Sequence, residues 1–412
     1  AADLGRHYGA EIHLVGVTGV QPGAVAHTPE EYKRALEEFA NRLSREKGVG
    51  FHAHAEVSHD PAVELDKIIE RKSEEIGVDL GTATVLIYVK GQGIMLREPS
   101  VIAMVRDTGE VKAVGDEAYR MLGRTPGNIT AVRPMRDGVI ADYDLTEKML
   151  QAFVRKVVTG PGRFFRPHIM VCVPSGVTEV ERRAVLQATR EVGARKAFLI
   201  EEPLAAAVGA GVDIAEPTGS MIVDIGGGTT DVAIISLGGI VVSESLRIAG
   251  NEFDEALIRY IRHKENLLIG DRTAEEVKMK VGAAILPEGE QDEEIEVRGR
   301  DLINGLPKTI TVRTADTVEA LEEPIQKIAD GVRRVLELAP PELVSDVIDR
   351  GIIMTGGGAL LRNFDELLRR TTGIPVAVAE NATDCVALGT GKALDMLHVL
   401  QDALISDNFL RR

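Results

Sequence analysis

The sequence has few of the residues that mark secreted or membrane-spanning proteins. Its 412 residues include two cysteines, Cys172 and Cys385, which lie far apart in apolar stretches. This spacing predicts buried thiols in a reducing cytoplasm and argues against a disulfide framework. No run approaches the ~18 apolar residues of a membrane-spanning helix, and no secretory signal pattern is present. We therefore expect a cytoplasmic protein without a spanning helix.

Basic charge is also scarce. The chain carries 64 acidic and 48 basic side chains, a formal net charge of −16, and the basic residues are scattered among the acids. A negative protein without a basic stripe is poorly suited to bind a phosphodiester backbone, so no nucleic-acid partner is expected. The length exceeds that of an ordinary single domain. More than one domain is therefore expected.

The most informative feature that is present is a pattern that occurs twice. Residues 76–91 read IGVDLGTATVLIYVKG, and residues 221–239 read MIVDIGGGTTDVAIISLGG. Each copy has an apolar strand ending in Asp, a turn of small residues with Thr, and a second apolar strand. Glycine permits backbone conformations closed to other residues, so the N–H groups of such turns can surround a phosphate. Together the two turns would hold a polyphosphate from two sides.

The acid and hydroxyl side chains of this pattern suit a phosphate that carries magnesium. Asp79 and Asp224 occupy matching positions, and Mg²⁺ prefers one or two carboxylates together with retained waters and substrate oxygens. Thr82, Thr229 and Thr230 could add hydroxyl contacts. Two ordinary glycine-containing hairpins would look similar, but the matched Asp positions favour phosphate binding.

A third glycine cluster, Gly356, Gly357 and Gly358, joins a buried strand to a helix within residues 352–368. Glycines at such a turn let the backbone approach a ligand, here a nucleoside; alone they would indicate only a close strand–helix contact. Residues 389–393, GTGKA, lack the glycine spacing and the hydroxyl residue of a P-loop. No G-x-G-x-x-G motif follows a predicted strand, so a nicotinamide-dependent dehydrogenase is not indicated.

Four motifs, in this order and spacing, carry a resemblance to a known family: DLGTA, DIGGGTTD, LIEEPLAAAVGAG and MTGGGALL. They resemble the ATPase superfamily of actins, chaperones and sugar kinases, and residues 75–412 resemble its MreB family of bacterial actin homologues. The resemblance implies an α/β, actin-like ATPase fold with two lobes around a nucleotide cleft. It places lobe I at 75–218, with a small subdomain at about 108–141. Lobe II would span 219–412, with a small subdomain at about 252–318 and a last helix that could return to lobe I.

The same resemblance assigns the site of an ATPase that uses ATP and Mg²⁺. Glu202 matches the residue that positions the attacking water, with help from Thr229. Its neighbour Glu201 would cap the helix, and both acids could instead simply favour the helix start. The magnesium ligands, through water, would be Asp79 and Asp224. The implied nucleotide-binding residues are Asp79, Gly81, Thr82, Ala83, Asp224, Gly226, Gly227, Gly228, Thr229, Thr230, Glu276, Lys278, Gly356, Gly357, Gly358 and Ala359.

A segment rich in glycine, proline and arginine carries two adjacent aromatic residues, Phe164 and Phe165. Apolar anchors flanked by Arg163 and Arg166 suit an anionic membrane surface, although two phenylalanines could equally form a local cluster. The family resemblance places a membrane-contacting loop here. It implies self-assembly into a filament at the inner face of the cytoplasmic membrane, with membrane proteins of the rod-shape and cell-wall synthesis machinery as partners.

Residues 1–74 differ in character from the rest of the chain. The strands GAEIHLVGVTGV and GFHAHAEVS enclose a long amphipathic helix, and this segment resembles part of a universal stress protein. That family's opening strand and glycine-rich nucleotide loop are missing, so no ATP-binding residue is assigned here. The abrupt junction after residue 74 indicates two joined sequences.

The sequence leaves three functions open. The first is a membrane-associated filament ATPase that guides rod-shape wall synthesis. The second is a non-polymerising, nucleotide-dependent binding module, which ATP-dependent sedimentation would distinguish. The third is a small-molecule kinase of the same superfamily, which would transfer phosphate to an added acceptor such as a sugar. No β-rich substrate domain follows the ATPase pattern, so chaperone activity is not expected.

Overall fold

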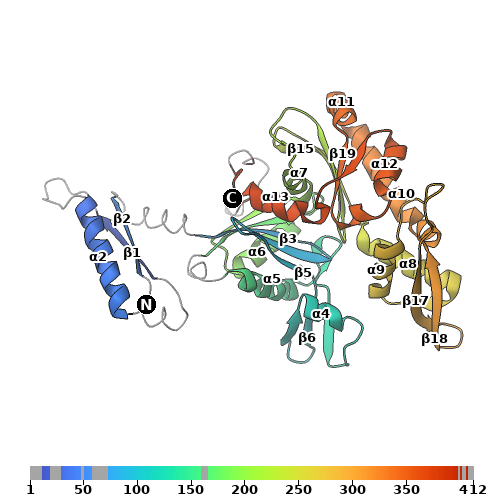
Figure 1. The fold of residues 1–412 in the computed structure, drawn as a ribbon, viewed down its shortest axis with the longest axis horizontal. Helices are drawn as coiled ribbons and strands as arrows, with labels where there is room; N and C mark the ends of the chain where they lie inside the picture. The colour runs from blue at the N-terminus through green and yellow to red at the C-terminus, as the bar shows by residue number, and fades with distance from the viewer. Residues whose placement is uncertain are drawn as a thin grey trace. The chain divides into compact units, whose positions relative to one another are not determined.

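The computed structural model describes residues 12–18, 29–47, 51–57, 73–158, 166–397, 400 and 405–406. The chain divides into two compact units, whose elements are labelled in Figure 1. The first unit comprises Ala1–Glu74 and Arg155–His168, and the second comprises Glu75–Val154 and Ile169–Arg412.

The first unit contains two parallel strands and a helix. β1 (Ile12–Thr18) pairs with β2 (Phe51–Val57), with Ile12 opposite Phe51. Parallel strands need a crossover connection, and α2 (Pro29–Lys47) lies within it. The helix is amphipathic, since Ala40 is buried whereas the neighbouring acids are exposed. The predicted strand–helix–strand order is confirmed.

The second unit contains two large sheets. The first sheet has the strand order β21–β12–β11–β3–β4–β5. Its strands are β3 (Glu75–Leu80), β4 (Thr84–Val89), β5 (Gly93–Pro99), β11 (His168–Val173), β12 (Lys196–Glu201) and β21 (Ile405–Ser406). β3 and β4 are antiparallel, with Asp79 opposite Leu86, which confirms the first strand–turn–strand unit. α5 (Tyr143–Val157) and α6 (Glu179–Glu191) lie between its strands in the sequence.

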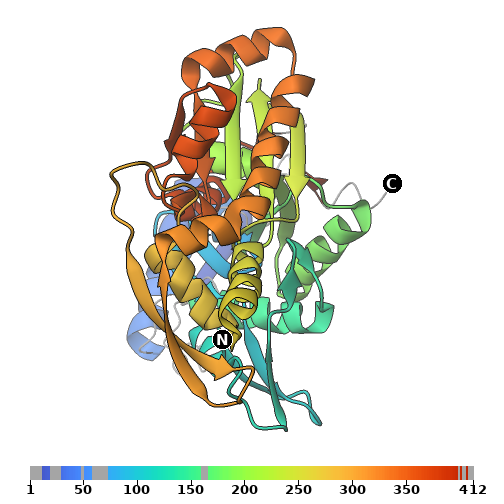
Figure 2. The same ribbon diagram turned by 90° about the vertical axis from the view of Figure 1, so that its right-hand side faces the viewer.

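The second sheet has the order β15–β14–β13–β19–β20. Its strands are β13 (Ser220–Ile225), β14 (Thr230–Ser236), β15 (Gly239–Leu246), β19 (Ile352–Thr355) and β20 (Val376–Val378). β13 and β14 form the second predicted hairpin, which is also confirmed. Figure 2 shows the long helix α10 (Thr314–Leu338) lying along this sheet. The other helices that follow β12 are α7 (Glu202–Gly209), α8 (Gly250–Glu265), α9 (Asp271–Val281), α11 (Pro341–Arg350), α12 (Phe364–Thr372) and α13 (Cys385–Ala393).

Each large sheet is accompanied by a small three-stranded one. The first small sheet has β6 (Ile102–Val105) between β7 (Val111–Val114) and β8 (Ile129–Val132), and its core includes a residue of α4 (Asp116–Met121). The second has β17 (Glu294–Asp301) between β16 (Leu267–Leu268) and β18 (Pro307–Arg313). Residues 287–301, which are rich in acids, lead into and form the first strand of the β17–β18 hairpin. Two short strands, β9 (Met135–Arg136) and β10 (Val139–Ile140), form a further hairpin.

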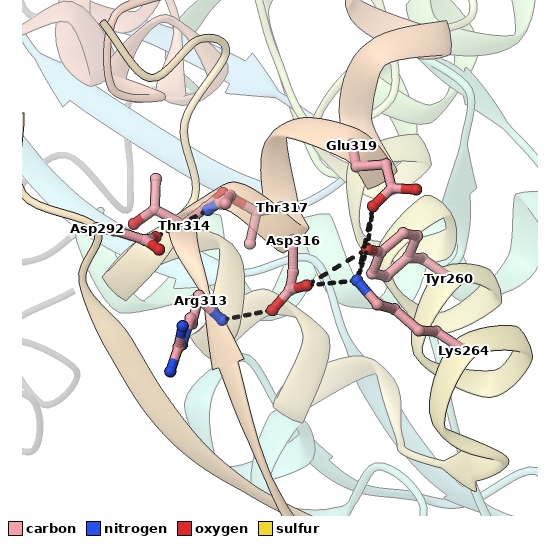
Figure 3. Close-up of polar contacts among 9 residues, drawn as sticks. Tyr260, Lys264, Asp292, Arg313, Thr314, Asp316, Thr317 and Glu319 are labelled. Atoms are coloured by element: carbon pink, nitrogen blue, oxygen red, sulfur yellow. Dashed lines mark hydrogen bonds and ion pairs between the residues drawn. The ribbon is translucent and has the colours of Figure 1, made fainter. Parts of the chain in front are cut away.

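A large core lies between the second sheet and helices α8, α9, α10 and α12. Its residues come from β13, β14 and β19 and from the apolar faces of these helices, and the rings of Phe253 and Phe364 lie 6.4 Å apart. Polar contacts fix the start of α10 against the end of α8 (Figure 3). The Asp316 carboxylate accepts hydrogen bonds from the Arg313 backbone N–H, at 2.9 Å, and from Lys264 Nζ, at 2.7 Å.

A second core joins the two large sheets through α7 and α13. It includes residues of β11, β12, β13 and β14 together with both helices. The helices touch backbone to backbone, because a Cβ on Gly389 would lie 1.7 Å from the Ala205 carbonyl oxygen and one on Gly209 would lie 1.8 Å from that of Cys385. A Cβ on Gly391 would lie 2.0 Å from the Tyr88 ring in β4. The expected lobe boundaries remain predictions. In the part of the chain described here, no helix is both long and apolar enough to cross a bilayer.

Candidate functional site

A cavity of about 560 Å³ is lined by residues of both large sheets, in the size range of small-molecule sites. Both glycine turns of the repeated hairpins line it, as do α9 and the 3₁₀ turn η2 (Gly357–Leu360). The predicted residues that line it are Asp79, Gly81, Thr82, Ala83, Glu202, Asp224, Gly226, Gly227, Gly228, Thr229, Lys278, Gly356, Gly357 and Gly358.

The two glycine turns interlock at one side of this cavity. A Cβ on Gly227 would lie 2.5 Å from the Cβ of Ala83, and one on Gly228 would lie 2.5 Å from Thr82 Oγ1. The Thr82 hydroxyl also accepts a hydrogen bond from the backbone N–H of Gly138, at 2.9 Å. Because side chains at these glycines would push the turns apart, the sequence needs Gly here for the backbones to meet.

Two carboxyl groups line the cavity from matching strand ends, the half-buried Asp79 and the buried Asp224. Asp224 in β13 lies beside Thr355 in β19, and the Thr355 hydroxyl donates a hydrogen bond to Asp224 Oδ1 at 2.7 Å. Burial nevertheless raises the pKa of Asp224 to about 7 and that of Asp79 to about 6. The Cys172 thiol, which donates to Asp79 at 3.4 Å, partly opposes the second shift. These carboxyl groups thus lack full compensation for their charge.

Glu202 is the first residue of α7 and directly follows β12 of the first sheet. It is buried and lines the cavity. Burial raises its pKa well above the ordinary value, and the negative charges of Asp231, Asp224 and Asp79 raise it further. Asp231 stands opposite Asp224 in the β13–β14 ladder and accepts hydrogen bonds from the Ser175 N–H and hydroxyl, at 2.8 and 2.7 Å. Four acids therefore influence one another around the cavity.

The neighbouring acid Glu201 behaves differently. It occupies the N-cap position of α7, but its side chain makes no capping hydrogen bond. Glu201 Oε1 instead accepts a hydrogen bond from Arg182 Nη2, at 3.0 Å. The expected capping role is therefore wrong, because the carboxylate pairs with an arginine that the fold brings within reach.

The other side of the cavity combines a cation with exposed apolar side chains. Lys278 Nζ lies 2.8 Å from Asp254 Oδ1 and donates to the Gly250 carbonyl at 2.9 Å. Met279 and Leu360 line the cavity although they are 78% and 62% exposed. Large apolar side chains at a cavity mouth suit a flat, partly apolar ligand group such as a purine.

Several sequence-predicted residues lie elsewhere. Thr230 is fully buried, and its hydroxyl donates to the Ile248 carbonyl at 2.6 Å. Ala359 is the buried residue of η2 and packs in the core, and Glu276 is exposed and pairs with Lys280 at 2.7 Å. None of these three is among the cavity-lining residues. The membrane candidates Phe164 and Phe165 lie outside the described residues.

Sequence reasoning missed other lining residues, among them Arg97, Gly138, Glu275 and Met279. The last two had a usable signal. Glu275, Lys278 and Met279 are spaced three and four residues apart, so they share one face of α9, and Gly282 directly follows the helix. With Lys278 on the cavity side, its helical neighbours are better candidates than Glu276. Arg97 and Gly138 carry no comparable signal, because tertiary packing alone brings them to the cavity.

Two sheets that present repeated strand–glycine turn–strand hairpins to one cavity define the actin-like ATPase fold. Comparison with known proteins gives the same class. A family model described as "MreB/Mbl protein" matches residues 73–402. The chain belongs to the MreB/Mbl family, and residues 1–72 lie outside the match.

Characterised relatives extend over nearly the same region. The cell shape-determining protein MreB of Escherichia coli (strain K12) is 54% identical over 339 residues, which are 81% of this chain and 97% of that protein. The cell shape-determining protein Mbl of Bacillus subtilis (strain 168) is 51% identical over 334 residues, 81% of this chain and 99% of that protein.

Solved structures agree with the fold. The crystal structure of MreB5 of Spiroplasma citri bound to ADP is 39% identical, with a TM-score of 0.74, and covers 80% of this chain and 98% of that chain. The AMPPNP-bound crystal structure of that protein is 40% identical with a TM-score of 0.75 over the same shares. A MamK double helical filament, 24% identical with a TM-score of 0.66, supports the fold alone. The predicted actin-like fold is confirmed.

Proposed function

We propose that this chain binds ATP with Mg²⁺ in the cavity, hydrolyses it slowly to ADP and phosphate, and assembles with itself into filaments. The observation that carries the proposal is the pair of interlocked glycine turns with a cavity-lining carboxyl group, Asp79 or Asp224, at the strand end before each. The similarity to Spiroplasma proteins bound to ADP and AMPPNP supports a nucleotide as ligand.

The donor set fits a magnesium ion. Asp79, which is half-buried, and Asp224, which is buried, line the cavity and have raised pKa values, so a divalent cation would supply the compensation that they lack. Mg²⁺ bound with retained waters prefers one or two carboxylates plus phosphate oxygens. When bound, the ion would neutralise charge on the phosphates.

Glu202 and Thr229 would orient the attacking water. Both are buried and line the cavity. The negative charges that raise the pKa of Glu202 are those of the surrounding Asp side chains. When those charges are offset, Glu202 ionises more easily and can accept a hydrogen bond from water. Phosphoryl transfer to water depends mostly on such positioning and on charge stabilisation.

The remaining lining residues suit the nucleoside. Gly356, Gly357 and Gly358 line the cavity, as do Lys278 and Met279 of α9. We assign the adenosine to this side. Thr230, Ala359 and Glu276, expected from sequence to contact nucleotide, would act only indirectly.

The relatives are named cell shape-determining proteins, which supports a role in cell shape; the filament and membrane roles rest on the family resemblance. We propose a cytoplasmic filament at the inner face of the cell membrane, working with membrane proteins of the rod-shape and cell-wall synthesis machinery. Phe164 and Phe165 remain the predicted membrane contact. A filament multiplies weak single-loop contacts into firm attachment through avidity.

Sedimentation combined with phosphate release tests the proposal. With ATP and Mg²⁺ the wild-type chain should pellet and release phosphate without an added acceptor. Glu202→Ala should bind ATP but release phosphate roughly 100-fold more slowly, the order of loss seen when a residue that positions or activates the reacting group is removed. Glu201→Ala is the matched control, because its side chain pairs with Arg182 outside the cavity. If the wild type neither pellets nor releases phosphate, the filament ATPase is excluded.

A further inference from the structure

Tyr119 in α4 contacts two side chains of α9, a helix that comes more than a hundred residues later. Its hydroxyl donates a hydrogen bond to Glu275 Oε2. The guanidinium carbon of Arg272 lies 5.4 Å from the centroid of the Tyr119 ring. Both are direct contacts, the first a charge-assisted hydrogen bond and the second a cation–π interaction.

A third side chain ties this contact to the first glycine turn. The guanidinium carbon of Arg133 lies 5.9 Å from the Tyr119 ring centroid, and its Nη1 donates to the Ala83 carbonyl at 3.2 Å. Ala83 lines the cavity and meets Gly227 of the second turn. A continuous series of contacts therefore runs from the interlocked turns through Arg133 and Tyr119 to α9.

The α9 end of this series also faces the cavity. Glu275 lines it on the helix face that carries Lys278 and Met279. α4 packs in the core of the first small sheet, whereas α9 packs in the core of the second sheet. The contact therefore connects elements that accompany different large sheets, and both of those sheets contribute to the cavity wall. Separating α4 from α9 would open the wall at Glu275.

We propose that Tyr119 is a clasp residue, which holds α4 against α9 through Glu275 and Arg272 and thereby slows release of the nucleotide. The proposal deepens the proposed function and rests on it, since it concerns the same cavity. Tyr119 itself is not among the cavity-lining residues, so it acts through Glu275 as a positioning residue. Burial and the bond to Glu275 raise the pKa of Tyr119 to about 12, so its hydroxyl remains a donor at neutral pH.

Tyr119→Phe removes the hydroxyl and keeps the ring, and Tyr119→Ala removes both. The measurement is dissociation of mant-ADP with Mg²⁺ from the full chain after addition of excess unlabelled ADP. A partly exposed hydrogen bond to a carboxylate is worth about a factor of ten or less, so Tyr119→Phe should release mant-ADP about 3- to 10-fold faster. Tyr119→Ala should release it faster still, because the cation–π contacts are lost as well.

Tyr260→Phe is the matched control. The Tyr260 hydroxyl donates to Glu319 Oε2 at 2.5 Å and accepts a hydrogen bond from Lys264 Nζ at 2.5 Å (Figure 3). None of these three residues is among those that line the cavity. Tyr260→Phe also removes a hydrogen bond from a tyrosine hydroxyl to a glutamate carboxylate, but away from the cavity lining, so an unchanged dissociation rate of mant-ADP is expected. In a Glu275→Gln background, Tyr119→Phe should have a smaller effect than in wild type, because both changes weaken one hydrogen bond.

The outcomes separate the two proposals. If wild type binds mant-ADP but Tyr119→Phe and Tyr119→Ala release it at the wild-type rate, the clasp is wrong and the nucleotide site stands. Equal acceleration by Tyr260→Phe would also overturn the clasp, since the effect would then be general loosening. If wild type binds no mant-ADP, the proposed function fails first and the clasp fails with it.

Discussion

Asp224 and Thr355 illustrate, at the scale of single residues, how a strand register sets the chemistry of a site. The two residues are paired in the parallel ladder of β13 and β19, so the hydroxyl of one reaches the carboxyl group of the other. Both side chains are buried. The carboxyl group is thereby oriented before any ligand arrives.

We predict that Thr355→Val destabilises the nucleotide-free protein. The change keeps the side-chain volume but leaves Asp224 without this donor, which costs about 1–3 kcal/mol for a buried acceptor. The midpoint of thermal unfolding should fall by roughly 2 to 5 °C for a unit of this size. Thr189→Val is the control, because the Thr189 hydroxyl bonds only to the Val185 carbonyl of its own helix, at 2.7 Å. A larger loss for Thr189→Val would contradict the argument.

A sequence motif indicates which residues reach the cavity where the motif fixes the backbone geometry. Asp79, Asp224 and the glycines of both turns line the cavity because their hairpins leave the backbone little choice. Glu276 was misplaced because a motif does not say which face of a helix turns inward. Glu201 and Glu202 are adjacent and chemically alike, and the position of Arg182, which pairs with Glu201, is a tertiary feature.

At the scale of elements, α6 shows a helix whose start is encoded locally. Thr178 and Glu181 form a capping box, in which the Glu181 backbone N–H donates to Thr178 Oγ1 at 3.3 Å and Glu181 Oε2 accepts from the Thr178 N–H at 2.6 Å. Together these bonds satisfy two backbone donors at the helix start. The sequence TEVERRAVLQATREVG therefore carries its own helix-start signal.

We predict that Thr178→Ala loosens the first turn of α6. Loss of a cap costs about 1 kcal/mol, so amide hydrogen exchange there should accelerate about 5-fold. Mass spectrometry of the intact protein measures this. Glu179→Gln is the control, since it loses only an exposed pair with Arg183 at 3.6 Å, which contributes little.

The stabilisation that the Thr178–Glu181 capping box provides should depend on pH. The Thr178 backbone N–H holds the pKa of Glu181 below its ordinary 4.5. A lowered pKa in the folded state means that the stabilisation is present above pH 4.5 and is lost as the pH falls further. The Thr178 hydroxyl also donates to Glu181 Oε2, at 2.7 Å, and helps to lower that pKa; Thr178→Ala removes this bond. The difference in stability between wild type and Thr178→Ala should therefore shrink in acid; a difference that grew in acid would contradict this sign.

At the scale of the whole molecule, the described residues that line the cavity all belong to the second unit. Its lining residues run from Asp79 to Val386, and the family match begins at residue 73. The backbone N–H of His168 donates to the Glu74 carbonyl at 2.9 Å, so Glu74 should be kept in any shortened chain. Among the residues that the structure describes, the first unit contributes none to the lining of this cavity.

We predict that a chain starting at Ser73 binds ATP with an affinity within about twofold of the full chain, because every described lining residue is retained. Fluorescence titration with mant-ATP and Mg²⁺ measures the affinity. Sedimentation of the same two chains shows whether residues 1–72 obstruct assembly, and pelleting of the short chain alone would identify them as an obstruction. A tenfold loss of affinity would contradict the assignment of the whole site to the second unit.

The large-scale organisation was predictable in part. The repeated hairpins indicated the actin-like fold, because each sheet carries one copy. The boundaries of the lobes and of their small subdomains could not be read from the residues, since the chain passes between the sheets without a linker of distinct composition. β21, which joins the first sheet beside β12, also has no signal in its two residues.

The crossing of α7 and α13 determines how the two large sheets can move. At Gly209 and Gly389 one backbone lies directly on another, with no side chain between them that could change rotamer. Such a backbone contact resists sliding of one helix along the other but tolerates a change in the angle between the two helices. The displacement that a rotation causes grows with distance from the rotation axis. A small rotation at these glycines would therefore produce larger movements at elements far from the crossing. A bulkier residue at Gly389 would therefore be expected to hinder this change of angle as well as disturb local packing.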